Sequence, residues 1–291
     1  MKLEWPQRVR SLHPLVHCIT NYVTVNDVAN LLLACGASPV MADAEEEAAE
    51  MAGIAQALLI NLGTLNPRTV RSMHLAAASA NRRGIPIVLD PVGVGATTFR
   101  NNTAEALLRE HQFALIRGNI SEIKALATIV QSGQSADSAQ AGTTKGVDAQ
   151  ASDLQDDAQG RIALARSLSQ RTGAVVVISG AQDVIAGADD PALLCSNGCA
   201  AMQDITGSGC MLSALLAAYS AAAWNAEGNR QHNLLYAAAA GVAAMGICGE
   251  RAEQLTRQHA GGNASLRTHL IDSVYRLDTL DDAVKLSVVN E

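Results

Sequence analysis

Residues 57–90 carry the sequence ALLINLGTLNPRTVRSMHLAAASANRRGIPIVLD, which decides the fold class of the chain. Two nearly continuous apolar runs, at 57–61 and 85–90, flank a longer stretch of helical character at 67–82. Apolar runs of this kind are typical of parallel strands that are covered on both faces of a sheet. The stretch therefore predicts a strand–helix–strand unit.

The same alternation continues along most of the chain, so a central, mostly parallel sheet flanked by helices is expected. Further strands are predicted at 38–42, 113–117 and 174–179, and a hairpin at 183–188 and 192–196 is predicted at one sheet edge. Helices are predicted at 25–35, 45–51, 103–110, 121–128, 160–171, 207–224, 231–251 and 265–275. We expect an α/β fold with one domain over residues 1–291.

One segment, at about 131–157, interrupts this pattern. It is rich in Ser, Gln, Ala, Gly and Asp and has almost no bulky apolar residue. Because the sheet pattern resumes after it, the segment is interpreted as a long flexible loop within the domain, and not as a linker between domains.

Composition argues against several classes of partner. Aromatic residues make up 3% of the chain, too few for platforms that stack single-stranded nucleic acid. The net charge of −7 argues against any polyanionic polymer. The beginning of the chain lacks a signal-peptide apolar region, and the apolar stretches 209–224 and 234–248 fall short of the ~20 residues of a spanning helix. We expect neither a nucleic-acid partner nor a membrane segment.

The chain has six cysteines, and their spacing makes no paired metal-binding pattern. Most are interpreted as reduced, small core residues of a cytoplasmic protein. Only Cys210 has a local setting that indicates chemistry.

That setting is the segment Thr206-Gly-Ser-Gly-Cys210, which opens onto a helical run. A glycine-rich turn before a helix exposes backbone N–H groups at the positive end of the helix dipole. Gly207, Ser208 and Gly209 are therefore predicted to form an anion hole. A cysteine in the first helical turn tends to have a lowered thiol pKa, so Cys210 is a candidate base or nucleophile.

Polar residues and glycine recur where the predicted strands end, at 61–64, 90–93, 117–119 and 179–180. Open parallel sheets bind ligands beyond the carboxyl ends of their strands. The recurrence predicts a shared cleft at this edge.

Three charged residues at these strand ends suit a phosphorylated ligand. Asn119 and Glu122 suit a helix cap, but Glu122 alternatively points into the cleft and organises Mg²⁺ through water. Asp90 supplies a second carboxylate, and Arg117 is placed to pair with a triphosphate.

Two further segments suit a wall of a substrate pocket. The polar run 16–27, which includes Asn21, precedes a helix and is either a cap with buried hydrogen bonds or part of the pocket. Met41 puts a flexible thioether at a strand end, where it suits a small aromatic ligand, although a methionine is more often a core residue.

Together these motifs resemble the hydroxyethylthiazole kinase family, ribokinase-like enzymes of thiamine salvage. The matching segments occur in order at 17–27, 36–42, 89–96, 117–122, 206–210 and 266–272. The resemblance implies a three-layer ribokinase-like fold and ATP- and Mg²⁺-dependent phosphorylation of 5-(2-hydroxyethyl)-4-methylthiazole. It also implies a homotrimer with the thiazole site between subunits. The chain departs from the family in a segment near 131–157 whose start looks lengthened.

The resemblance also implies roles for single residues. It places Asp90 and Glu122 at the metal, and it places Arg117, Asn119 and Ser179 at ATP. It places Met41, Gly207 and Asn21 at the thiazole, and Cys210 where sugar kinases of this fold usually have aspartate. Cys210 is then either the general base or a small residue that leaves the anion hole open.

Two other functions stay open at this point. One is a related small-alcohol kinase that acts on a pyrimidine or on pyridoxal. The other is a non-catalytic protein that binds thiazole or nucleotide with the same fold.

Overall fold

The computed structural model describes residues 4–132, 157–280 and 283–289. Its centre is one sheet with the strand order β2-β1-β3-β4-β5-β6-β7-β8-β9. The strands are β1 (Leu15–Ile19), β2 (Ser38–Val40), β3 (Ala57–Asn61), β4 (Ile87–Asp90), β5 (Leu115–Asn119), β6 (Val175–Ser179), β7 (Asp183–Ala186), β8 (Ala192–Cys195) and β9 (Leu286–Val289). Strands β1 to β6 pair in parallel, and β7, β8 and β9 continue the sheet with antiparallel pairing.

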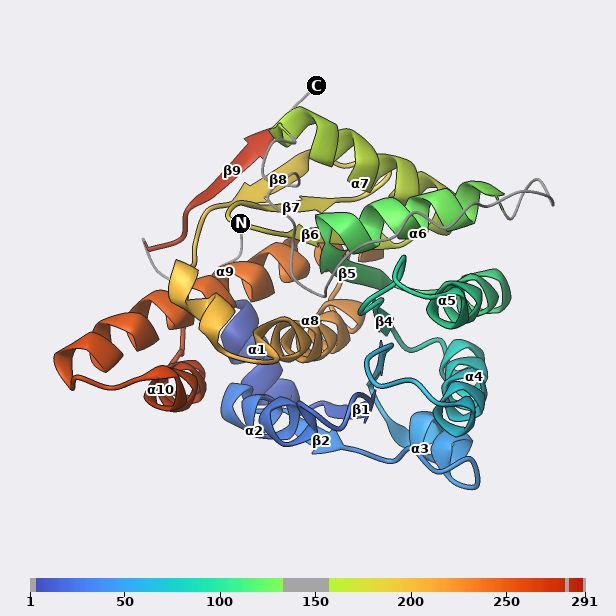
Figure 1. The fold of residues 1–291 in the computed structure, drawn as a ribbon, viewed down its shortest axis with the longest axis horizontal. Coiled ribbons are helices and arrows are strands. Elements are labelled where there is room, and N and C mark those ends of the chain that lie inside the picture. The colour runs from blue at the N-terminus through green and yellow to red at the C-terminus, as the bar shows by residue number, and fades with distance from the viewer. Residues whose placement is uncertain (1–3, 133–156, 281–282, 290–291) are drawn as a thin grey trace.

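Helices cover both faces of the sheet, which gives three layers (Figure 1). On one face lie α1 (Trp5–Leu12), α2 (Val25–Cys35), α8 (Ser208–Trp224), α9 (Arg230–Gln258) and α10 (Asn263–Tyr275). On the other face lie α3 (Ala48–Ile54), α4 (Pro67–Arg83), α5 (Thr98–Glu110), α6 (Ile120–Ser132) and α7 (Ala158–Thr172). A 3-10 helix, η2 (Ala200–Asp204), precedes α8.

Each face has its own hydrophobic core, because alternate residues of every strand point to opposite sides. Leu59 and Val88 point toward α8, whereas Leu58 and Leu89 point toward α4 and α5. The continuous apolar runs of the sequence are the consequence of burial on both faces, as the sequence predicted.

The predicted α/β fold with a mostly parallel sheet is confirmed, with three omissions. The prediction missed α1 and β9, and it treated β1 as part of a polar run because His17 interrupts the strand. In the fold His17 is fully buried, and its Nε2 atom lies 2.6 Å from the carbonyl oxygen of Ala42. Burial lowers the pKa of His17, which keeps the imidazole neutral inside the sheet layer.

The long loop predicted at 131–157 falls almost wholly outside the described residues. Its two ends are corrected, because Ser132 still belongs to α6 and Asp157 is the N-cap of α7. The Asp157 side chain accepts a hydrogen bond from the backbone N–H of Gly160, which fixes the start of that helix.

The length predicted for the last apolar stretch is also corrected. Helix α9 has 29 residues. By length and composition alone, this helix is long enough and apolar enough to cross a membrane. Of its most apolar window, 83% is buried inside the fold. A core helix passes the same test, and α9 packs against α8 and α10.

Candidate active site

The site lies where the order of the strands reverses. From β1 the chain crosses to β2 on one side and later to β3 on the other, so β1 and β3 are neighbours whose connections leave in opposite directions. Ligands of open α/β sheets bind in the crevice that such a reversal opens beyond the carboxyl ends of the strands. Asn21 lies just beyond β1, Asn61 ends β3 and Asp90 ends β4.

Cys210 enters this crevice from the first turn of α8. Its Sγ atom accepts hydrogen bonds from Asn21 Nδ2 and from Asn61 Nδ2, each at 3.3 Å. The same Asn61 amide group donates to Asp90 Oδ2 at 2.8 Å, and Ser213 Oγ donates to that oxygen at 2.8 Å. One hydrogen-bonded network therefore joins the thiol to the carboxylate.

Asp90 is fully buried, and its second oxygen, Oδ1, has no hydrogen-bond partner among the described residues. A buried carboxylate oxygen without a donor is costly, so it marks a position that a cation or a proton would satisfy. Burial raises the pKa of this carboxyl to about 7, although Arg117 opposes the shift. At neutral pH the free protein thus holds a mixture of protonated and ionised Asp90.

The expectation of a lowered thiol pKa at Cys210 is wrong. Burial and the nearby carboxylate of Asp90 raise the pKa of this thiol above its ordinary value. The donated hydrogen bonds from Asn21 and Asn61 oppose the shift without reversing it. Position at a helix N-terminus favours a thiolate, but here the loss of solvent outweighs it.

The glycine-rich turn before α8 is packed so closely that side chains are excluded. Gly207 has φ +84, and a Cβ atom added there would lie 2.2 Å from the Thr24 methyl carbon. A Cβ atom on Gly209 would lie 2.6 Å from Nη1 of Arg117. Helix α8 has no side-chain cap hydrogen bond at its start. The predicted anion hole, Gly207–Gly209, is therefore a close-packed turn with a guanidinium against it.

Arg117, in the middle of β5, reaches Ser179, the last residue of the adjacent strand β6. Arg117 Nη2 donates to Ser179 Oγ at 2.7 Å, and Ser179 Oγ donates to the carbonyl oxygen of Gly118 at 3.3 Å. The Nε atom of Arg117 is buried and has no partner among the described residues. The guanidinium is thus held in place by neutral hydrogen-bond partners, while the carboxyl groups of Asp90, Glu122 and Asp183 lie within its electrostatic range.

Asn119 and Glu122 form a reciprocal cap at the start of α6, so the capping interpretation is confirmed. Asn119 Oδ1 accepts from the backbone N–H of Glu122, and Glu122 Oε2 accepts from the backbone N–H of Asn119, each at 2.9 Å. Glu122 Oε1 also accepts from the Gly93 N–H at 2.9 Å. Burial raises the pKa of Glu122, although both backbone hydrogen bonds oppose the shift.

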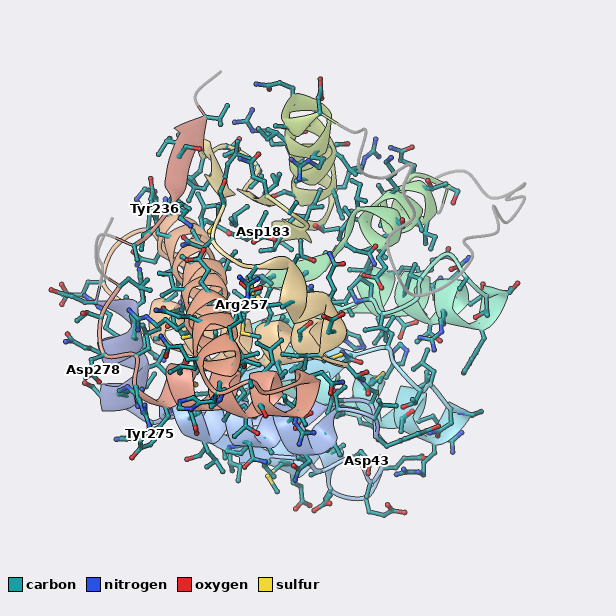
Figure 2. All side chains as sticks on the ribbon, turned by 60° about the vertical axis from the view of Figure 1, so that its left-hand side comes forward. Asp43, Asp183, Tyr236, Arg257, Tyr275 and Asp278 are labelled. Carbon is teal, nitrogen blue, oxygen red and sulfur yellow. The ribbon has the colours of Figure 1, made fainter. Side chains whose placement is uncertain are left out.

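A cavity of about 310 Å³ opens beside this network. Met41, Thr64 and Asp43 are among its lining residues, and Asp43 is labelled in Figure 2. Gly63 also lines it, and a Cβ atom at that position would lie 2.7 Å from Asn21 Cβ. The cavity therefore adjoins the residues that donate to Cys210, and it is large enough for a small heterocycle.

The fold brings most of the predicted residues together. Cys210, Asn21 and Asp90 share one network, and Arg117 lies against the turn that precedes Cys210. Met41 lines the adjoining cavity and also packs against the core, so the core interpretation holds and its contact with a ligand stays a prediction.

Sequence reasoning missed three contributors to the site. Asn61 was noted only as a polar strand end, yet it links the thiol to the carboxylate; a carboxamide that closes an apolar strand was the available signal. Ser213, one turn after Cys210, gave no signal apart from its helical spacing. Asp183, labelled in Figure 2, begins β7, and burial raises the pKa of its carboxyl to about 6.

Comparison with known proteins gives a consistent result. Residues 7–279 match the model of the hydroxyethylthiazole kinase family. A hydroxyethylthiazole kinase of Clostridium acetobutylicum is 48% identical over 96% of both chains, and one of Clostridium tetani is 47% identical over 93% of this chain and 91% of its own. The solved structure of a hydroxyethylthiazole kinase from Pyrococcus horikoshii has a TM-score of 0.81 at 32% identity and covers 99% of this chain and 98% of its own.

A more distant structural neighbour supports the fold alone. A ribokinase-like superfamily protein from Enterococcus faecalis has a TM-score of 0.57 at 11% identity, over 92% of this chain and 88% of its own. The single α/β domain is therefore of the ribokinase-like type.

Proposed function

The chain belongs to the hydroxyethylthiazole kinase family, and we propose that it transfers the γ-phosphoryl group of ATP to the hydroxyl of 5-(2-hydroxyethyl)-4-methylthiazole. The observation that carries the proposal is the position of Cys210. Its thiol lies at the start of a helix without a side-chain cap, within a network that adjoins a cavity of about 310 Å³. The product suits thiamine salvage.

Charge neutralisation is the main task in this transfer, because phosphoryl transfer needs positioning and electrostatic stabilisation more than covalent chemistry. The backbone N–H groups of Gly207 and Gly209 and the dipole of α8 favour an anion at the turn. The Ser208 N–H donates to the carbonyl oxygen of Ile205 at 3.3 Å, and we propose that it turns to the anion when ATP binds. Arg117 brings a full positive charge to the same turn, and Ser179 orients it. We assign Arg117, Ser179 and Asn119 to the binding of ATP.

Asp90 and Glu122 are the residues that would hold Mg²⁺. The fit is supported by the unpartnered Asp90 Oδ1 and by a donor set made of carboxylate oxygens, which Mg²⁺ prefers. When bound, the ion would neutralise the charge that develops on the phosphate oxygens. Both carboxyl groups have raised pKa values, so a cation would favour the ionised form of each.

The thiazole ring is assigned to the cavity beside Met41, with Asn21 and Gly207 at its inner end. In this pose the substrate hydroxyl approaches Cys210. As the oxygen attacks the γ-phosphorus and ADP leaves, the hydroxyl proton must be removed. We propose that the Cys210 thiolate takes this proton as an assisting base, and that the anion hole and the metal supply the larger part of the rate enhancement.

We further propose that the whole chain, residues 1–291, forms this single domain in the cytoplasm and assembles as a homotrimer with shared thiazole sites. Tyr22, Val23 and Leu33 support the assembly, because they expose 77%, 58% and 58% of their surface and Tyr22 also lines the cavity. Sedimentation that shows a fully active monomer would reject the shared site.

The function is tested by incubating the folded protein with ATP, Mg²⁺ and the thiazole alcohol and measuring the monophosphate. Product formation is expected, and no product from a folded, magnesium-replete protein rejects the proposal. Parallel reactions with pyridoxal and hydroxymethylpyrimidine test the related-kinase alternative. Tight thiazole binding without any ATP-dependent product would favour the non-catalytic alternative.

A further inference from the structure

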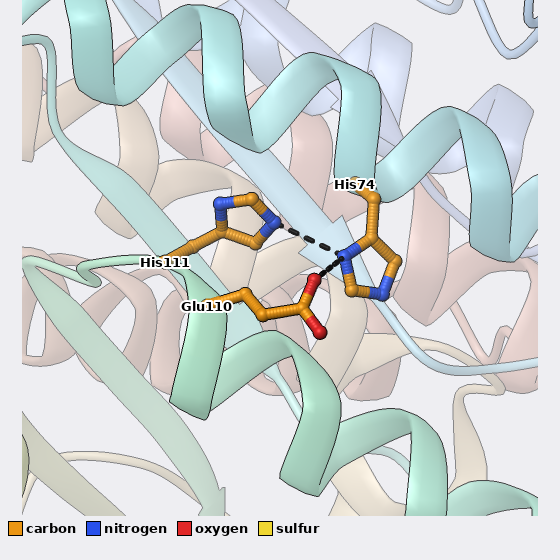
Figure 3. Close-up of side chains that lie close together, drawn as sticks. All are labelled: His74, Glu110 and His111. Carbon is orange, nitrogen blue, oxygen red and sulfur yellow. Dashed lines mark hydrogen bonds and ion pairs between the residues drawn. The ribbon is translucent and has the colours of Figure 1, made fainter.

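A second cluster of ligand-type side chains lies outside the site described above. His74 projects from α4, Glu110 is the last residue of α5, and His111 follows directly (Figure 3). His74 Nδ1 lies 3.1 Å from His111 Nε2 and 3.1 Å from Glu110 Oε2. His111 precedes β5, whereas Asn119, assigned to ATP, is the last residue of β5, so the cluster belongs to the opposite end of that strand.

Hydrogen bonds alone do not satisfy this cluster well. A neutral imidazole carries one hydrogen, so His74 Nδ1 can donate to Glu110 or to His111 but has no second proton for the other. If His74 Nδ1 is instead an acceptor, its lone pair points at the lone pairs of the Glu110 carboxylate, and the two acceptors repel each other. Arg109 donates to Glu110 Oε1 at 3.1 Å, which leaves Oε2 as the oxygen turned toward the imidazoles.

The spacing of these atoms suits a metal ion. Nitrogen and oxygen ligands lie about 2.0–2.1 Å from zinc, so neighbouring ligands of a tetrahedral site lie roughly 3.3 Å apart. The separations of His74 Nδ1 from His111 Nε2 and from Glu110 Oε2 are both 3.1 Å and suit this spacing. All three ligand atoms lie within 4.8 Å of one another, so His111 Nε2 and Glu110 Oε2 would draw closer on binding if they lie farther apart than this spacing. Two imidazoles and one carboxylate form a ligand set that zinc uses in proteins.

The segment that carries two of the ligands is held to α4 by a second link. Asn81 lies seven residues after His74, which places it on the same face of the helix. Its Nδ2 atom donates to the Gln112 carbonyl oxygen and its Oδ1 atom accepts from the Gln112 N–H, each at 2.9 Å. The positions of Glu110 and His111 relative to His74 are therefore fixed before any ion binds.

We propose that His74, Glu110 and His111 bind one Zn²⁺ ion, or a divalent transition metal of similar preference, at a site that ties the middle of α4 to the end of α5. The Glu110 side chain is 47% exposed, so a water molecule can occupy the fourth position. Because the site ties α4 to the end of α5 and lies at the opposite end of β5 from the ATP residues, we assign the metal a stabilising role and no part in phosphoryl transfer.

The test uses the full-length, untagged protein freed of transition metals. It is titrated with Zn²⁺ in a buffer that contains excess Mg²⁺. Calorimetry is expected to show one zinc equivalent whose affinity falls at least ~10-fold in His74→Ala, since even the loss of an outer-shell partner typically costs 10–100-fold. Alanine suits the interior of α4, so this variant should fold. Zinc should also raise the Tm of the wild-type protein and leave that of the variant unchanged.

Glu110→Gln is the second variant, because glutamine keeps the shape and a hydrogen-bond acceptor but removes the charge. It should weaken zinc binding in the same direction even if His74→Ala fails to fold. Substituted Co²⁺ adds a spectroscopic readout, since a four-coordinate site gives a visible absorption that both variants should lose.

His232→Ala is the matched control. His232 Nδ1 lies 3.2 Å from Asp190 Oδ1, a similar imidazole–carboxylate contact that belongs to no three-ligand cluster among the described residues. This variant should bind zinc like the wild-type protein. Equal affinity and stoichiometry in wild type and Glu110→Gln, or the absence of a stoichiometric zinc equivalent in the wild type, would overturn the proposal.

Discussion

Helices α8 and α9 follow one another in the chain and pack side by side, yet they begin in opposite ways (Figure 1). Asn229 caps α9, and its side chain accepts a hydrogen bond from the His232 N–H at 3.1 Å. Helix α8 begins at Gly207, which offers no side chain for a cap. A capped helix end satisfies its own N–H groups, whereas an uncapped one leaves them for an anion.

The difference is enforced by packing. The methyl group of Thr24 occupies the place that a Cβ atom of residue 207 would take, and Arg117 occupies the place beside residue 209. The cap stabilises the start of α9, whereas the uncapped start of α8 is the place that we assign to an anion.

Gly209→Val should lower turnover by more than ~10³-fold, because it displaces Arg117 and distorts several donors of the turn at once, each of which is commonly worth 10²–10³-fold. Steady-state kinetics measures the loss, with circular dichroism to show that the fold persists. Gly173→Ala is the control for backbone strain alone: Gly173, unlike Gly209, has positive φ, at +72, but nothing lies within 4 Å of an added Cβ atom. A well-folded Gly209→Val enzyme with normal turnover would break the contrast.

Cys210→Ala should lower turnover by about 10²-fold, the lower part of the range for general acid–base catalysis, since backbone donors remain. The raised pKa of the thiol means that little thiolate exists at neutral pH. Turnover of the wild-type enzyme should therefore rise with pH between about 6 and 9, a range that brackets the ordinary thiol pKa of ~8.5.

In Cys210→Ala that rise should disappear, and Cys210→Asp should restore activity with a flatter profile because a carboxylate is already ionised. If the alanine variant keeps unchanged turnover across the range, the thiol is dispensable and the residue only keeps the anion hole open.

Asp90→Asn should change how stability depends on pH. The folded-state pKa of Asp90 is about 7, above the unfolded value of ~3.9, so the folded state binds the extra proton and stability falls as pH rises between these values. Between pH 6 and 8 the free energy of unfolding of the metal-free wild type should drop by roughly 1 kcal/mol through this group.

Denaturant unfolding at both pH values measures the drop, most of which should be lost in Asp90→Asn. Asp183→Asn serves as comparison: its pKa of about 6 lies at the lower edge of this window, so that variant should lose only a smaller part of the drop. An identical pH dependence in wild type and Asp90→Asn would contradict the assignment.

Asn229→Ala should cost about 1 kcal/mol of stability, the usual value of a helix cap, and leave turnover unchanged. Thermal unfolding and the kinase assay together check both halves of this expectation. A loss of turnover without a loss of stability would mean that the start of α9 also serves the site.

The sequence was sufficient for the frame of the molecule and insufficient for its electrostatics. Runs such as 57–61 and 174–179 predict strands because both of their faces are buried. Strand β1 was not predicted, because His17 resembles a surface residue in the sequence. Only the structure shows that His17 is buried beside the carbonyl oxygen of Ala42. The thiol pKa of Cys210 was predicted in the wrong direction, because helix position is visible in a sequence and the depth of burial is not.

The sequence identified those site residues that lie at the ends of strands or beside the glycine-rich turn. Asp90, Asn119 and Ser179 close strands, and that local rule is independent of the rest of the chain. Arg117 was found by the same rule although β5 runs two residues farther than the predicted strand. Asn61 was not assigned to the site because its importance depends on reaching both Cys210 and Asp90, which only the assembled sheet brings within 3.3 Å and 2.8 Å of it.

The hydrogen bond between Asn21 and Cys210 joins positions 189 residues apart in the chain. Contacts of such separation form late, since the closure of a long loop must precede any gain from them. During synthesis the strands from β1 to β6 leave the ribosome before α8 exists, so the growing chain has its polar strand ends but neither the thiol nor the glycine turn. Catalytic competence therefore arrives in one step near the end of translation, and a truncated product that lacks α8 has no means of consuming ATP at this site.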